Sequence, residues 1–210
     1  MVNFNIEIRK VVLSFVSYGK QEIALINEYL ENHFVVIVAI RKGADKEYLL
    51  DDHQISPSSN LYIFECDFEN KYSSQEFQQL LFKSFYPIDV LVTDLGDTSE
   101  IILNPVFPFE GSGEFVKMKL NPFANLLTCM FPMLNTKRSF FFEIFKSSYL
   151  NGVELKELKR MAESRKKIIL DKLLEDNSNT NIIHQKIDLL LDGRRFLKSG
   201  SLGPSYTSYI

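Results

Sequence analysis

The sequence predicts a doubly wound α/β fold: a single domain with a parallel sheet of six to seven strands and helices on both faces. Two observations predict it. Apolar runs of strand length alternate along the chain with amphipathic segments of about ten or more residues, as strands joined by crossover helices require. The second apolar run, HFVVIVAI at 33–40, is almost continuously apolar, which is typical of a strand covered on both faces.

Each element follows from its own pattern. Short apolar runs predict strands at 8–16, 33–40, 60–68, 88–94, 139–145 and 181–191. Amphipathic periodicity predicts helices at 22–32, 74–85, 115–134 and 153–176, the third with a kink at Pro122. We expect a helical turn and a loop over 44–60. The domain is predicted to span residues 1–198, and the Gly-, Ser- and Tyr-rich residues 199–210 to form a flexible tail.

The composition narrows the classes of function. The 18 Phe residues among 210, with no Trp, predict a Phe-rich core. A formal net charge of -3 argues against a nucleic-acid partner, which requires a basic face. No stretch approaches the roughly eighteen apolar residues of a membrane span.

The cysteines and histidines point to a reduced compartment and to no metal. Cys66 and Cys129 each lie in an apolar segment, so we expect buried thiols and a cytoplasmic protein, not a disulfide framework. His33, His53 and His184 lack the spacing of metal ligands. We therefore predict no metal site.

The first strand-to-helix turn is a poor phosphate cradle. Its sequence, SFVSYGKQE at 14–22, contains Gly19 alone. A dinucleotide turn needs several glycines, because side chains keep the backbone N–H groups away from the pyrophosphate. Lys20 offers one point charge in their place.

Several phrases, in order along the chain, resemble the short-chain dehydrogenase/reductase family. They are CDF at 66–68, IDVLVTDLG at 88–96 and MKLNPFANLLTCMFP at 118–132, with Arg41 after the second strand. The resemblance covers roughly residues 8–188 and implies a Rossmann-like fold. It implies cofactor positions at Gly19, Lys20, Arg41, Asp67 and Gly96, with NADP(H) as the cofactor if there is any. Because the glycine-rich turn is missing, we expect no cofactor.

The resemblance also implies where the family's catalytic residues would fall. The family uses a Tyr as general acid/base, a Lys four residues later, a Ser thirteen residues before the Tyr, and an Asn on the preceding long helix. The matching positions here are Met161, Arg165, Ser148 and Lys119. A thioether has no titratable proton, so Met161 cannot transfer one. No confident catalytic residue is predicted.

These departures predict a catalytically degenerate relative, more a binding partner than an enzyme. We expect a structural or regulatory subunit that forms homo- or hetero-oligomers through helices 115–134 and 153–176, with an active reductase as one candidate partner. One alternative is an enzyme that kept the cleft but changed the chemistry. It would bind a nucleotide or a small acid through Lys20, Arg41, Lys119 and Arg165, or act as a divergent NADP(H)-dependent oxidoreductase with a displaced acid such as Tyr149. Another is a sensor that binds a dinucleotide or small ligand without turnover.

Overall fold

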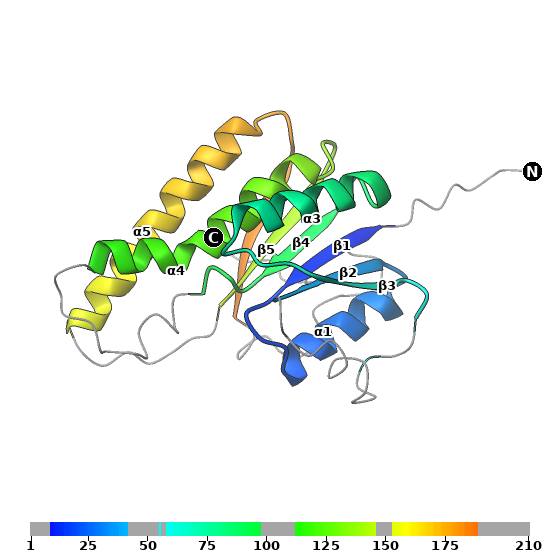
Figure 1. The fold of residues 1–210 in the computed structure, drawn as a ribbon, viewed down its shortest axis with the longest axis horizontal. Coiled ribbons are helices and arrows are strands. Elements are labelled where there is room, and N and C mark those ends of the chain that lie inside the picture. The colour runs from blue at the N-terminus through cyan, green and yellow to red at the C-terminus, as the bar shows by residue number, and fades with distance from the viewer. Residues whose placement is uncertain (1–8, 42–54, 56–57, 98–111, 146–152, 189–210) are drawn as a thin grey trace, which may run out of the picture.

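The computed structural model describes residues 9–41, 55, 58–97, 112–145 and 153–188. Strands and helices alternate along this part of the chain (Figure 1). The strands are β1 (Lys10–Ser14), β2 (Val35–Ile40), β3 (Leu61–Glu65), β4 (Val90–Thr93), β5 (Ser139–Phe145) and β6 (Ile182–Asp188). The helices are α1 (Lys20–Glu31), α3 (Lys71–Ser84), α4 (Ser112–Met130) and α5 (Val153–Asp176), and a short 3-10 helix, Phe131–Met133, follows α4.

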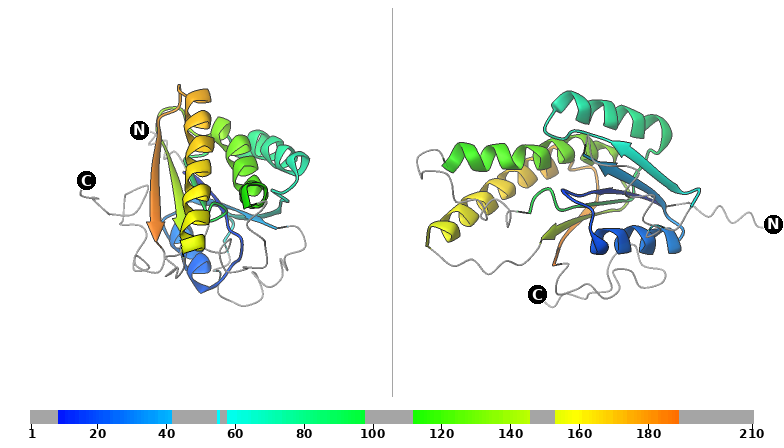
Figure 2. Two further views of the ribbon diagram at one scale, coloured as in Figure 1. Left: turned by 90° about the vertical axis from the view of Figure 1, so that its left-hand side faces the viewer. Right: turned by 60° about the horizontal axis from the view of Figure 1, so that its bottom comes forward.

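The described strands form one parallel sheet in the order β3-β2-β1-β4-β5-β6. Helix α1 covers one face of the sheet, and α3, α4 and α5 cover the other (Figures 1 and 2). The predicted class, a single doubly wound α/β domain, is confirmed. Helix α4 runs through Pro122 as one element. The loop predicted at 44–60 falls mostly, and the tail at 199–210 entirely, outside the described residues.

Two apolar layers hold the helices on the sheet, and Phe side chains fill much of both. Strand β5 shows how the faces are divided, because successive side chains of a strand point to opposite faces. Phe140, Phe142 and Ile144 lie in the layer with α1. Phe141 lies in the layer with α3, α4 and α5, and the alternation puts Glu143 on that same face. The predicted Phe-rich core is confirmed.

The winding of the sheet reverses between β1 and β4, where folds of this kind bind their ligands, at the carboxyl ends of the strands. Ser14, the last residue of β1, pairs with Thr93, the last residue of β4, and Thr93 pairs with Glu143. All three polar residues are buried, and the candidate site lies at their level, at the carboxyl ends of the strands.

The first long helix, α4, uses most of its apolar side chains inside the molecule. Six apolar side chains of α4 and of the residues just after it are buried in the core: Phe123, Leu126, Leu127, Met130, Phe131 and Leu134. Among the helices in the described ranges, none combines the length and the apolar character that crossing a bilayer requires.

Candidate functional site

Carboxylates of the protein itself occupy the turn between β1 and α1. The Val16 N–H donates to Oδ1 of Asp94, which follows β4, at 2.7 Å. The Gly19 N–H donates to Oε2 of Glu22 in the first turn of α1, at 3.0 Å. Both carboxylates are buried. Two backbone donors of the turn that leads from β1 into α1, the region where folds of this kind bind phosphate, are thus already bound to carboxylates.

Tyr18 lies across the neighbouring strand ends. Its hydroxyl donates to the carbonyl oxygen of Ala39 in β2 at 2.7 Å, and the hydroxyl oxygen accepts the Phe15 N–H at 3.4 Å. Burial raises the pKa of this hydroxyl well above its ordinary value, so the group stays protonated and acts as a donor. The side chain therefore bridges the carboxyl ends of β1 and β2.

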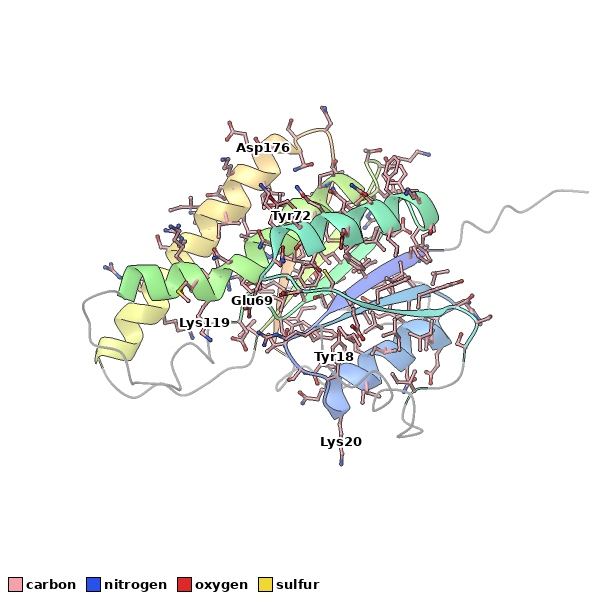
Figure 3. All side chains as sticks on the ribbon, viewed as in Figure 1. Tyr18, Lys20, Glu69, Tyr72, Lys119 and Asp176 are labelled. Atoms are coloured by element: carbon pink, nitrogen blue, oxygen red, sulfur yellow. The ribbon has the colours of Figure 1, made fainter. Side chains whose placement is uncertain are left out.

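Two of the other predicted cofactor positions, Arg41 and Asp67, contact Glu69. Lys20 is exposed and extends away from the sheet at the start of α1 (Figure 3). The Arg41 guanidinium is paired with the carboxylate of Glu69, and both side chains are largely exposed. The Asp67 carboxylate accepts the N–H of Glu69 at 3.0 Å, which shapes the turn before α3.

Gly96 joins this site to α4 and α5. Its carbonyl oxygen accepts a hydrogen bond from Lys166 Nζ at 2.7 Å. A Cβ at this position would lie 2.8 Å from the ring of Phe123, closer than side-chain carbons approach each other. The loop after β4 packs against α4 only because residue 96 has no side chain.

Replacing Gly96 with alanine is expected to lower the free energy of unfolding by about 1–3 kcal/mol, because the added methyl group overpacks against Phe123. Urea denaturation followed by circular dichroism measures the loss. Gly19→Ala is the comparison: its Cβ meets the flexible end of Glu22 at 3.2 Å, so we expect a cost of about 1 kcal/mol or less. Equal losses in the two variants would contradict the role given to Phe123.

The inner face of α5 carries Ala162 and Lys166, which lie four residues apart and are both buried. Met161 is half-buried and Arg165 is exposed. The residues aligned with the family's Tyr and Lys thus lie one position away from the pair that faces the sheet. Lys119 is exposed on α4, and Figure 3 shows it on the lower side of that helix. Ser148 and Tyr149 lie outside the described residues.

Lys166 is the centre of a buried charge network. Its ammonium group pairs with the carboxylate of Glu143, and only 3% and 1% of the two side chains are exposed. The same ammonium lies 3.2 Å from Glu163 Oε1. His184 completes the inner group, with Nε2 3.3 Å from Glu143 Oε2 and its ring stacked on Phe141. At the outer side, Lys186 Nζ donates to Glu163 Oε2 at 2.8 Å.

The network keeps its carboxylates ionised. Burial by itself raises the pKa of Glu143, but the neighbouring His184 imidazole and the charge of Lys166 outweigh it, so the pKa lies below its ordinary value. For Glu163, the same opposing effect of burial is outweighed by Lys186 and Lys166, and its pKa is also lowered. Both groups remain carboxylates at neutral pH.

A lowered pKa predicts a stability that falls in acid. A carboxylate with a lowered pKa stabilises the fold above its ordinary pKa of 4.5, and this contribution is lost as the pH falls through its folded-state pKa. We therefore expect the free energy of unfolding to decline below about pH 4.5. Urea titrations at a series of pH values measure the decline. Glu143→Gln should flatten it, and an unchanged slope in that variant would contradict the assignment.

The two cysteines match the sequence prediction of buried thiols. Cys66 and Cys129 are free and buried, and burial raises the pKa of the Cys66 thiol to about 12, which makes it a poor nucleophile. Within the described part of the chain, no group of three or more His, Cys, Asp or Glu side chains is arranged to hold a metal ion.

Comparisons with known proteins bear on the fold. No family model matches the sequence, and no curated protein matches it. Among solved structures, the chain is similar to YwfH, an NADPH-dependent reductase involved in bacilysin biosynthesis (TM-score 0.61, 14% identity, 86% of this chain and 76% of that one). It is also similar to a short-chain dehydrogenase/reductase from Serratia marcescens (TM-score 0.60, 12% identity, 86% and 73%). A third is serine dehydrogenase from Escherichia coli (TM-score 0.57, 15% identity, 85% and 81%). The chain has the short-chain dehydrogenase fold.

Within this fold, the structure identifies residues that sequence reasoning missed. They are Asp94 and Glu22 at the turn, Tyr18 beside them, and Glu143 with Lys166. One signal was available: Glu143 interrupts the apolar run SFFFEIF, and a carboxylate buried in a strand needs a cationic partner. The cationic partner could not be predicted, because nothing in the local sequence distinguishes Lys166 from the other basic residues of RKK at 165–167.

Proposed function

We propose that this protein has kept the short-chain dehydrogenase fold without hydride transfer, and that it acts as a structural or regulatory subunit. One observation carries the proposal: the Asp94 and Glu22 carboxylates accept the Val16 and Gly19 N–H groups of the β1–α1 turn. Those donors would otherwise be available to a pyrophosphate.

Electrostatics supports this reading. Two like charges 4 Å apart repel by about 4 kcal/mol near a protein surface, so a pyrophosphate beside two carboxylates would be strongly disfavoured. Tyr18 adds bulk at the ends of β1 and β2. The residues at this turn therefore do not fit a dinucleotide held in the manner of a glycine-rich loop, and no bound cofactor is part of the proposal.

Helix α5 itself contains no Tyr that could serve as the family's proton donor. Met161 cannot transfer a proton, and Lys166, the buried cation of α5, is paired with Glu143 and the Gly96 carbonyl. In this pair, the Lys166 ammonium is not available to lower the pKa of a phenol or to bind a ribose hydroxyl. Proton transfer in the manner of the family would need a different set of residues.

The alternative functions find less support. For an oxidoreductase or a sensor bound to NADP(H), Lys20, Arg41, Lys119 and Arg165 would have to gather around one ligand. Lys20, Lys119 and Arg165 are exposed on three different helices, and Arg41 is paired with Glu69. The arrangement favours neither alternative.

The proposed partner surface is the outward side of α4 and α5. Each of these helices leaves one large apolar side chain exposed within its described part, Met118 on α4 and Ile168 on α5. The partner would be a second copy or an active reductase of the same fold. A cytoplasmic setting, in which both thiols stay reduced, belongs to the same proposal.

Titration with NADPH and with NADH, by isothermal calorimetry and by nucleotide fluorescence, tests the proposal. We expect no saturation, with any Kd above about 1 mM, whereas an NADPH-dependent reductase of this fold serves as the positive control. Micromolar binding together with turnover of a carbonyl substrate would refute it. Micromolar binding without turnover would favour the sensor.

A further inference from the structure

The outer face of α3 carries aromatic side chains that the core does not use. Tyr72, Phe82 and Tyr86 are 78%, 63% and 45% exposed. Phe82 and Tyr86 rest against each other, with ring centroids 5.2 Å apart. In both views of Figure 2, α3 lies at the outside of its layer, and no other helix or strand of the described chain covers it. Large exposed aromatic rings are typical of protein–protein interfaces.

The same face carries little charge. Helical spacing places a set of exposed side chains on it, and Tyr86 continues the set just beyond the helix end: Tyr72, Gln75, Glu76, Gln79, Phe82 and Lys83. Glu76 is the acid of this set and Lys83 its base, and Lys71, which is also exposed, lies on the side of the face that carries Phe82. Over the described part of α5, by contrast, the exposed side chains are charged apart from Ser164 and Ile168. Because charged residues are depleted at the centres of interfaces, α3 is the better docking face of the two.

We propose that a second copy of this chain docks on this face, with the two α3 helices antiparallel about a twofold axis at Gln79. Such an interface needs a surface that complements itself. Tyr72 and Tyr86 lie equally far from Gln79 in opposite directions, so the axis sets Tyr72 of one copy level with Tyr86 of the other. At each end of the helix pair, Tyr72 of one copy therefore lies near Tyr86 of the other.

Charge complementarity specifies the same arrangement. Glu76 and Lys83 lie on opposite sides of Gln79 along the helix, at nearly equal distances, and on the same side of it around the helix. The twofold axis therefore brings Glu76 of each copy beside Lys83 of the other. The pairing neutralises these two charges and selects the antiparallel orientation.

The chain that carries Tyr86 is fixed in position before docking. Phe85, which follows α3, is buried and packs on Tyr62 and Phe64 of the edge strand β3, with ring centroids 4.8 and 6.1 Å away. The chain around Tyr86 is thereby anchored to the core, which lowers the entropy lost on docking. One pair of helices buries less area than a standard interface of about 1,600 Å², so the dimer is weak and reversible.

This dimer is independent of the proposed function, because it leaves the outward sides of α4 and α5 available. Sedimentation velocity of the full chain, from micromolar to near-millimolar concentration, tests it. We expect a dimer fraction that rises with concentration. Glu76→Lys and Lys83→Glu should each weaken association at least about tenfold, because each places like charges together. The double variant E76K/K83E should restore it.

Charge reversals on α5, Asp171→Lys and Lys172→Glu, are the matched controls and should leave the dimer unchanged. Phe82→Ser gives a second route to a monomer, and thermal melts of all variants check that the fold is kept. A wild-type chain that stays monomeric throughout would overturn the proposal. So would a double variant no better than the single ones, or loss of the dimer in the α5 controls.

Discussion

Replacing Lys166 with methionine is expected to lower the free energy of unfolding by about 3–5 kcal/mol. The substitution keeps most of the side chain's volume but leaves the Glu143 carboxylate buried without its main cationic partner. It also removes the donor to the Gly96 carbonyl, which ties the loop after β4 to α5. Guanidinium chloride denaturation, followed by circular dichroism, measures the change.

The neighbouring lysine provides the control. Lys167 is exposed on the same helix, so Lys167→Met should change stability by no more than about 0.5 kcal/mol. Replacing both members of the buried pair, as Lys166→Met with Glu143→Leu, should recover part of the loss, because no charge is then stranded. If Lys166→Met were as mild as Lys167→Met, the buried network would not be a structural element of this fold.

Neutralising the two carboxylates of the β1–α1 turn is expected to raise the affinity for pyrophosphate at least about tenfold. The variant is Asp94→Asn with Glu22→Gln. Each new amide keeps an oxygen that can accept the Val16 or Gly19 N–H, so the turn retains its hydrogen bonds while two negative charges disappear. Calorimetric titration with inorganic pyrophosphate and with NADPH measures the gain.

A variant with the same change in net charge elsewhere separates this local effect from a general one. Glu31→Gln with Asp171→Asn removes two exposed carboxylates, at the end of α1 and on α5. We expect no gain in affinity from it. Equal gains in both double variants would show that the overall charge, and not the carboxylates at the turn, keeps anions away.

The order of strands and helices could be predicted from local patterns, because the spacing of apolar residues reflects which faces become buried. The apolar run at 33–40 contains β2, and the periodic segment 153–176 is α5 residue for residue. The weakness of Gly19 as part of a phosphate cradle was also readable, since glycine content determines how closely a backbone can approach an anion. The contact of the Asp94 carboxylate with the Val16 N–H could not be predicted, because the two residues are far apart in sequence.

The sequence by itself determined the class of fold, the parallel sheet and the absence of a glycine-rich turn, since each depends on residue type and short-range spacing. Only the tertiary structure decided which side of α5 faces the sheet. One residue along a helix is a rotation of about 100°, and this is what separates the exposed Arg165 from the buried Lys166. That rotation follows from packing on α4 and from the need of Glu143, alone in an apolar strand, for a cation.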